Sequence, residues 1–419
     1  MQLQPTGRAP VFSVLQNADF RALWCAGGLA EIARWMELMV LSWLVLQATD
    51  SPFQLGLVLV FNNVPRPFLS MFTGFVAERF SRHRILILAQ SVNVLAASTL
   101  LFLMAADLIE PWHVFIAVFA QGVGRAFEDP ARRTGLLDIV GERRLVNAMS
   151  LDVISNTAGK MIGPLLGGIL VDTVDFRGAY VFLVAVHLLS LLMFVVWVRI
   201  PLAERPNVGE PMWRSLTLAI RFALHSPTLL GLLYVTIVMN AMAFPVRQFI
   251  PAIGRDQLEL SATLVGLLLA AESFGQLAGA AVMALTRNLQ YLGRVYVIGS
   301  LAVLSTAALF SWSPWYGLAF ILLAIGGIGQ AGFSTMQSTI TLLAAPREMR
   351  GRMMGLLSVC IGAGTPLGTL EMGALATLST QWSITGNALL GLLLLLPILG
   401  LGPLARRPLT QPPPDAPRG

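Results

Sequence analysis

The sequence has little charge and few of the residues that enzymes use for nucleophilic or metal chemistry. Of its 419 residues, 12% are charged and 56% are hydrophobic, whereas roughly a quarter of the residues in soluble domains are charged. The 4 histidines are scattered, and the 2 cysteines, Cys25 and Cys360, lie in long apolar segments. Neither H-E-x-x-H nor G-x-x-x-x-G-K-[ST] occurs. We therefore expect neither an enzyme nor an ATP-driven pump, and we predict no metal site and no bound cofactor.

Long apolar runs take the place of the missing charge, and the mean hydropathy is +0.72. A helix that spans a bilayer needs about 20 mostly apolar residues. Such segments occur at approximately 20–46, 53–77, 85–106, 112–131, 147–172, 179–198, 228–250, 262–285, 293–312, 314–343, 353–378 and 383–404. The pattern predicts an all-α integral membrane protein with twelve transmembrane helices.

The longest polar interruption, residues 199–227, separates six spans from six. Within it, Trp213 to Leu224 has the pattern of a short amphipathic helix on the cytoplasmic face. Six spans on each side of such a linker indicate a duplicated six-helix unit. We expect an N-terminal stretch 1–19, six-helix bundles 20–198 and 228–404, the linker between them, and a Pro-rich disordered tail 405–419.

Basic residues mark every second loop. Of the 28 basic residues one is lysine, and the arginines lie in the N-terminal stretch, the linker, the tail and alternate loops that include Arg79–Arg84, Arg132–Arg144 and Arg347–Arg352. The loops between them hold little beyond Arg177 and Arg255. The positive-inside rule then places both termini in the cytoplasm, in a cell inner (plasma) membrane. The net charge of +6 fits a rim beside anionic lipid and not a nucleic-acid partner.

Ionisable residues inside the spans are candidates for function, because each costs about 2.5–3.5 kcal/mol on insertion scales unless it is paired. In the first span, Glu31 and Glu37 lie three residues before and after Arg34, so the three can form one stripe on a helix. Protonation of one carboxylate would neutralise this triad, and Glu37, the deeper acid, is the expected proton carrier. Arg125 in the fourth span belongs to the same expected charge network. A static triad that anchors the first helix is the alternative.

Two motifs resemble the major facilitator superfamily. "GFVAERFSRHR" resembles its loop signature G-x-x-x-D-R-x-G-R-K, with Gly74, Arg79 and Arg82 matching, Glu78 in place of Asp, Ser81 in place of the second Gly, and His83 in place of the last basic residue. Glu78 with the two arginines could form ion pairs that latch the cytoplasmic helix ends. The alternative is that these charges only set the orientation of the chain in the membrane, through the positive-inside rule.

The second motif is "GKMIGPLLGG", which resembles the helix 5 motif G-x-x-x-G-P-x-x-G-G of antiporters in this superfamily. The matching residues are Gly159, Gly163, Pro164, Gly167 and Gly168. Glycines at every fourth position form a groove for another helix, and the proline permits a bend. We expect a close-packed, bendable face at an interface that opens and closes. In the fourth span Val118 stands where the family's motif has arginine, which puts a proton-relay role for that helix in doubt.

"NADFRALW", "WLVLQATDSP" and "PREMRGRMMGL" resemble the drug/proton antiporter branch that includes macrolide and siderophore (enterobactin-type) exporters, and the resemblance covers about residues 16–400. It implies alternating access, the proton gradient as energy source, and efflux of an amphipathic drug-like or siderophore-like molecule. Small-molecule substrate, protons and lipid are the implied partners of a monomer. A facilitator, symporter or lipid flippase, with the charges acting as gates, remains the alternative.

The superfamily fold also implies which residues face one another. Helix 5 faces helix 8 and helix 2 faces helix 11 across the two halves, so we expect the inter-domain pairs Lys160 with Glu272 and Arg66 with Glu371. Pairing of each residue within its own half is the competing hypothesis. Helices 1, 4, 7 and 10 line the central cavity, where the adaptable aromatic and sulfur side chains are candidates for ligand contact. These candidates are Trp35, Met39, Met242, Phe244 and Phe333, which could equally be packing or lipid-facing residues.

Overall fold

The structure is a computed structural model, and it describes residues 11–69, 80–141, 144–201, 212–285, 291–346 and 349–401. Gly74, Glu78 and Arg79 of the loop motif lie outside the described residues, as does the expected tail 405–419.

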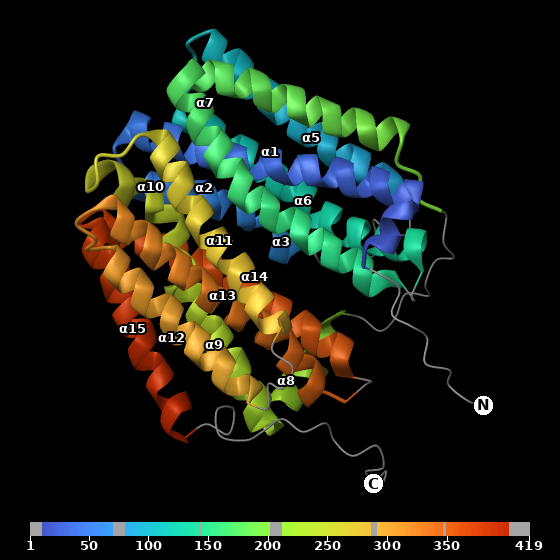
Figure 1. The fold of residues 1–419 in the computed structure, drawn as a ribbon, viewed down its shortest axis with the longest axis vertical. Coiled ribbons are helices and arrows are strands. Elements are labelled where there is room, and N and C mark those ends of the chain that lie inside the picture. The colour runs from blue at the N-terminus through green and yellow to red at the C-terminus, as the bar shows by residue number, and fades with distance from the viewer. Residues whose placement is uncertain are drawn as a thin grey trace.

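Helices form both halves of the molecule (Figure 1). The N-terminal half contains η1 (Val11–Gln16), α1 (Ala18–Thr49), α2 (Pro52–Asn63), α3 (Pro65–Leu69), α5 (Arg82–Ala105), α6 (Pro111–Val140) and α7 (Leu145–Val196). The C-terminal half contains α8 (Met212–His225), α9 (Pro227–Met242), α10 (Val246–Asp256), α11 (Ala262–Leu285), α12 (Leu292–Phe310), α13 (Tyr316–Ala344), α14 (Arg350–Ala376) and α15 (Thr380–Leu401). No strand occurs in the described ranges, and the predicted all-α membrane fold is confirmed.

Helix boundaries do not coincide one to one with membrane passes. The helix α7 contains two passes, because Val174 and Asp175 have non-helical backbone angles at its middle and the chain doubles back there (Figure 1). The second and seventh passes are each divided into two helices. Both breaks occur at a proline, which lacks the N–H that would continue the helix: Pro65 begins α3, and Pro245 precedes α10. With these corrections the twelve predicted spans follow one another along the chain.

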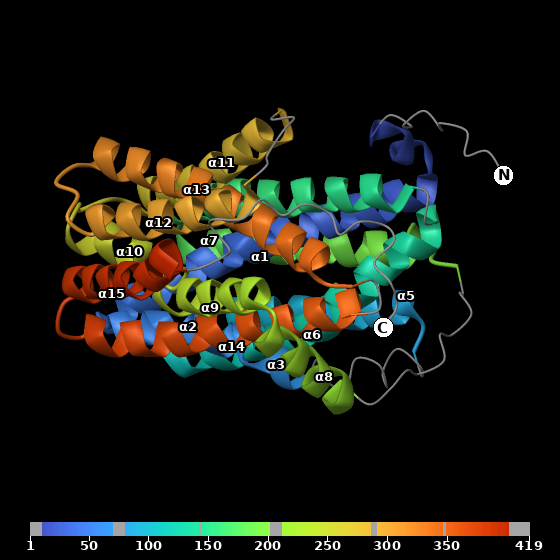
Figure 2. The same cartoon turned by 90° about the horizontal axis from the view of Figure 1, so that it is seen from below.

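We call the end of the bundle where α1 begins the inner end, and the end where α1 finishes at Thr49 the outer end. The names follow the orientation expected from the arginines. Figure 1 shows the two halves side by side, and in Figure 2 the helices of both halves run lengthwise between these ends. Large apolar side chains such as Leu95, Leu367 and Trp382 are about two-thirds exposed in the described chain. Such an apolar exterior is what a lipid environment requires.

The two halves are joined at the outer end by contacts at helix termini. The carboxylate of Asp172 in α7 accepts hydrogen bonds from the first backbone N–H groups of α11, Ala262 N at 3.2 Å and Thr263 N at 2.8 Å. In the opposite direction, Arg255 Nη1 of α10 donates to Leu46 O near the end of α1, at 2.7 Å. An acid therefore sits at a helix N-terminus and a base at a helix C-terminus, where the backbone dipoles favour each charge.

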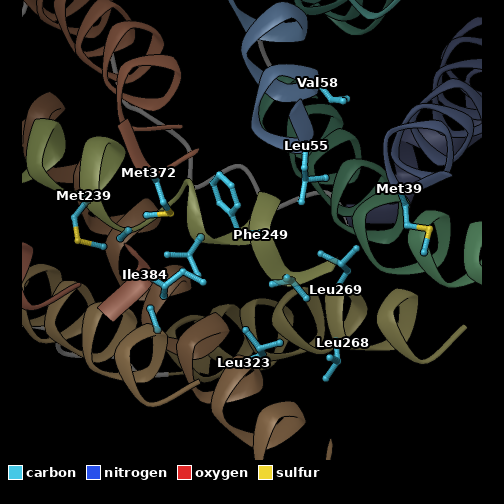
Figure 3. Packing of buried hydrophobic residues seen from close by; sticks show 14 of the residues in the cluster. Met39, Leu55, Val58, Met239, Phe249, Leu268, Leu269, Leu323, Met372 and Ile384 are labelled. Atoms are coloured by element: carbon cyan, nitrogen blue, oxygen red, sulfur yellow. The ribbon is translucent and has the colours of Figure 1, made fainter. Parts of the chain in front are cut away.

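Apolar packing continues across the same boundary. Phe249 of α10 is fully buried and lies beside Leu55 of α2 in the cluster of Figure 3, which also draws on Met39 of α1 and Leu268 of α11. One core thus extends through both halves near the outer end.

Close backbone contact at this boundary generates a prediction about Gly168. A Cβ at this position would lie 2.2 Å from Ala262 O of the other half, so Gly168→Ala requires α7 and α11 to move apart. We expect a loss of about 1–3 kcal/mol of stability, seen as a lower melting temperature of the purified protein. Gly355→Ala in α14 is the matched control, because a Cβ there meets nothing within 4 Å. Equal melting temperatures for the two variants would contradict this packing.

Candidate functional site

The carboxylate of Glu31 is the centre of a charge cluster that joins α1, α6 and α7. Its Oε2 atom pairs with Arg34 and accepts a hydrogen bond of 2.9 Å from Asn156 Nδ2. Its Oε1 atom lies 3.7 Å from Arg125 Nη2 and 3.9 Å from Arg132 Nη1. Glu31 is 8% exposed, so one buried carboxylate is shared by three guanidinium groups. Arg125, expected in this network from the sequence, does lie in it.

Further carboxylates of the described chain pair with arginines on the inner side of this cluster. Asp152 lies 2.5 Å from Arg132, and Asp129 lies 3.4 Å from Nε of Arg125. Nearer the inner end, Arg82 pairs with Asp138 of α6. Arg82 is the described one of the three residues that match the loop motif, and it links the start of α5 to α6.

Glu37 is separate from this cluster. Its carboxylate is 2% exposed, accepts a hydrogen bond of 3.2 Å from Tyr180 Oη, and lies 3.2 Å from His187 Nε2. A helix turns about 100° per residue, so Glu31 and Glu37 point in directions roughly 120° apart. The predicted triad of Glu31, Arg34 and Glu37 is therefore wrong: Arg34 pairs with Glu31, and Glu37 faces the second pass of α7.

The hydrogen bonds around His187 fix its tautomer. Asn93 Nδ2 donates to Gln90 Oε1 at 3.1 Å, which orients the Gln90 amide. Gln90 Nε2 then lies 3.2 Å from His187 Nδ1, which must accept. The proton of the neutral ring therefore resides on Nε2 and is donated to Glu37. This pair was not predicted from the sequence. The available signal was the spacing of Tyr180 and His187, which are seven residues apart and hence on one helix face.

The predicted pair of Lys160 with Glu272 is also wrong. Glu272 pairs with Arg247 of its own half, at 2.5 Å. Arg247 Nη2 also donates to the backbone oxygen of Lys160 at 3.5 Å, so it lies between the two residues that were expected to meet. Lys160 Nζ is 5.4 Å from the centre of the Trp35 ring, and no carboxylate of the described chain lies within 4.0 Å of it. The hydrogen bond that joins this lysine to the other half is made by its backbone oxygen.

The second expected pair, Arg66 with Glu371, does not form either. Glu371 accepts a hydrogen bond of 3.4 Å from Asn387 of its own half. Glu371 is near the outer end of α14, whereas Arg66 in α3 is farther toward the inner end, so the two differ in depth.

A cavity of about 240 Å³ adjoins the charge cluster within the N-terminal half. Its lining includes Arg34, Arg66, Arg125 and Lys160, the amide side chains of Asn62, Asn63, Gln121 and Asn156, and the ring of Trp35. Trp35 is also contacted from the other half, with Arg247 Cζ 5.3 Å from the ring centre. The cavity therefore borders the boundary between the halves.

Of the five predicted cavity residues, Trp35 alone lines this cavity. Met39 is buried in the core, and Met242 packs against the same core. Phe244 and Phe333 contact each other with ring centres 5.2 Å apart in the C-terminal half. Phe244 also borders a smaller cavity of about 40 Å³ beside Arg247 and Glu272.

The glycines of the helix 5 motif divide between two neighbours. A Cβ at Gly159, Gly163 or Gly167 would meet α1 of the same half, at 2.7–3.1 Å from the nearest atom. Gly168 alone of the four meets the other half. The expectation that the whole stripe faces a moving interface is therefore wrong, because three of its members hold α7 against α1.

Twelve passes in two halves, with buried charges and a polar cavity at their boundary, define a membrane transport protein of the major facilitator type. A family model described as "Transmembrane secretion effector" matches residues 9–405, and the chain belongs to this family. A solved POT family transporter in complex with 5-aminolevulinic acid has a TM-score of 0.75 at 11% identity and covers 92% of this chain and 96% of its own. A bacterial homolog of the human lysosomal transporter Spinster, inward-facing and unoccupied, has a TM-score of 0.71 at 15% identity, over 93% and 95%. These two likenesses show the fold.

Curated relatives are named as exporters. The chain is 28% identical over 377 residues to the enterobactin exporter EntS of Salmonella choleraesuis (strain SC-B67), which covers 88% of each chain. It is 26% identical over 371 residues to EntS of Escherichia coli O1:K1 / APEC, over 88% of this chain and 87% of that protein.

A double-mutant cycle tests the partner of Glu272. Arg247→Met and Glu272→Gln should each lower the melting temperature, and their combination should cost less than the sum. Residues in direct contact show coupling energies of about 0.5–3 kcal/mol. The comparison cycle, Lys160→Met with Glu272→Gln, should show a smaller coupling energy, because no ion pair within 4.0 Å joins these two described residues. A larger coupling in the lysine cycle than in the arginine cycle would refute the assignment.

Proposed function

We propose that this chain is a secondary active transporter that works by alternating access and exports an amphipathic, siderophore-like molecule in exchange for protons. The observation that carries the proposal is the polar cavity at the boundary of two six-helix halves, in a chain whose relatives are named enterobactin exporters. In this proposal the protein is a monomer in the inner membrane with both termini in the cytoplasm. The proton gradient supplies the energy, and no cofactor takes part.

The pattern of contacts between the halves supports alternating access. Several hydrogen bonds join described residues of the two halves. They are found at depths between Lys160 and the outer end of the bundle. Gln248 Nε2 of α10 adds to them, with bonds of 2.9 Å to Ser42 Oγ and 3.1 Å to Leu55 O. A molecule in the cavity is thus separated from the outer side by bonded helices. Export requires these bonds to break, which makes the outer end the element with two states.

Glu37 is the proton site in this proposal. Among the described residues it has no arginine or lysine within 4.0 Å, and its partners are Tyr180 and His187. Protonation of Glu37 therefore removes no ion pair to a permanently charged group. Protonation of Glu31 would deprive three arginines of their shared carboxylate, which makes Glu31 the poorer carrier.

Proteoliposomes with an imposed pH gradient test this proposal, with enterobactin as the transported probe. We expect the gradient to accelerate transport by the natural protein, and Glu37→Gln to remove that acceleration while leaving downhill exchange within about threefold. Glu259→Gln is the control, since Glu259 is exposed at the outer end. If the transport rate depends neither on the pH gradient nor on Glu37→Gln, proton coupling is rejected and a facilitator or flippase is favoured.

A further inference from the structure

The balance of charge in the 240 Å³ cavity is uneven. Four cationic side chains line it, and no carboxylate is among its lining residues. The positive charges of Arg34 and Arg125 are compensated by Glu31, which does not line the cavity. Arg66 and Lys160 have no carboxylate within 4.0 Å among the residues that the structure describes. Two cations are therefore held at membrane depth without a described carboxylate in direct contact, a costly arrangement that is typical of functional sites.

The hydrogen-bonding groups of the cavity wall point to the same conclusion. Five lining residues have a buried nitrogen without a hydrogen-bond acceptor: Arg34 Nε, Trp35 Nε1, Arg66 Nε, Gln121 Nε2 and Arg125 Nε, of which the last lies 3.4 Å from a carboxylate oxygen of Asp129. Each is a donor. A buried donor without an acceptor costs about 1–3 kcal/mol, so the wall has a surplus of positive charge and of donors.

The remainder of the wall is apolar. Leu38, Leu59 and Val118 line the cavity together with the charged and amide groups. The volume of about 240 Å³ is just below the range of complete small-molecule pockets, about 300–1,000 Å³. The cavity is therefore suited to one acidic group and its adjoining apolar ring or chain, and not to a large substrate as a whole.

We propose that this cavity binds an organic anion, through a carboxylate or phenolate group that is held by Arg66 and Lys160 and backed by the apolar wall. The inference rests on the proposed transport function and names the chemical class of its substrate: a molecule with at least one acidic oxygen group on an apolar body. Binding of such a group supplies the acceptors and the negative charge that the wall lacks.

Salicylate and salicylamide form a matched pair of probes, since they share a ring and differ in charge. With the purified full-length protein, isothermal titration should show salicylate binding at least about tenfold more tightly than salicylamide. Arg66→Gln and Lys160→Gln should each weaken salicylate binding about tenfold, and Arg66→Lys should restore part of the loss. Neither residue pairs with a described carboxylate, so neither change leaves an unpaired acid behind. Melting temperatures verify that the variants are folded.

Arg177→Gln is the control, because Arg177 is an exposed arginine that pairs with Asp107 outside the cavity. It should leave salicylate binding unchanged. Equal binding of salicylate and salicylamide would overturn the inference, as would unchanged binding in both cavity variants. Sulfate binding as tight as that of salicylate would overturn the organic part of it.

The outcome is distinguishable from that of the transport proposal. Cavity-dependent salicylate binding without gradient-driven transport would sustain the anion site and reject proton-coupled export. Gradient-driven enterobactin transport that is unaffected in Arg66→Gln and Lys160→Gln would sustain export and reject the anion site.

Discussion

The shared carboxylate of Glu31 is the interaction on which the arrangement of the N-terminal half depends. Three arginines from α1 and α6 converge on it. Removing this acid would leave Arg34 without a carboxylate partner among the described residues and would weaken the compensation of the other two arginines. Asn156 of α7 completes its hydrogen bonds, which requires α7 to lie very close to α1. Gly159 permits that approach, since a Cβ there would be 3.0 Å from the backbone of Glu31. The glycine motif and the charge cluster thus depend on the same close contact between α7 and α1.

The fold was predictable because insertion into a bilayer depends on properties of single segments. Apolar length alone yields twelve passes, and the Pro-containing breaks changed helix boundaries without changing that number. Residue partners depend on quantities that a single segment does not contain, namely the rotation of each helix and its depth relative to its neighbour. Lys160 and Glu272 do lie on facing helices, but Glu272 forms its ion pair with Arg247 of a third helix, α10.

Glu37 illustrates the part of the site that could have been derived. A spacing of three residues allows Glu37 to contact Arg34. The same helix geometry turns Glu37 away from Glu31, so the three side chains do not share one narrow face. His187 belongs to no sequence motif, since the four histidines are scattered along the chain. A neutral imidazole held by an amide and a carboxylate needs no sequence motif, since its partners come from α1 and α5 as well as α7.

Trp35 connects the two halves of the site. Arg34 and Lys160 of the N-terminal half and Arg247 of the C-terminal half all lie within 5.4 Å of its ring centre. An aromatic ring attracts one cation more easily than several cations that repel one another. Their mutual repulsion is least when negative charge is near. Glu272 provides that charge beside Arg247. On the cavity side Glu31 pairs with Arg34, and no described carboxylate lies within 4.0 Å of Lys160. A ligand shifts a conformational equilibrium only through different affinity for the two states. In the proposed export cycle, an anion beside Lys160 would meet this condition, because its attraction to Arg247 would exist while the halves are together at Trp35 and would be lost if α10 moved away.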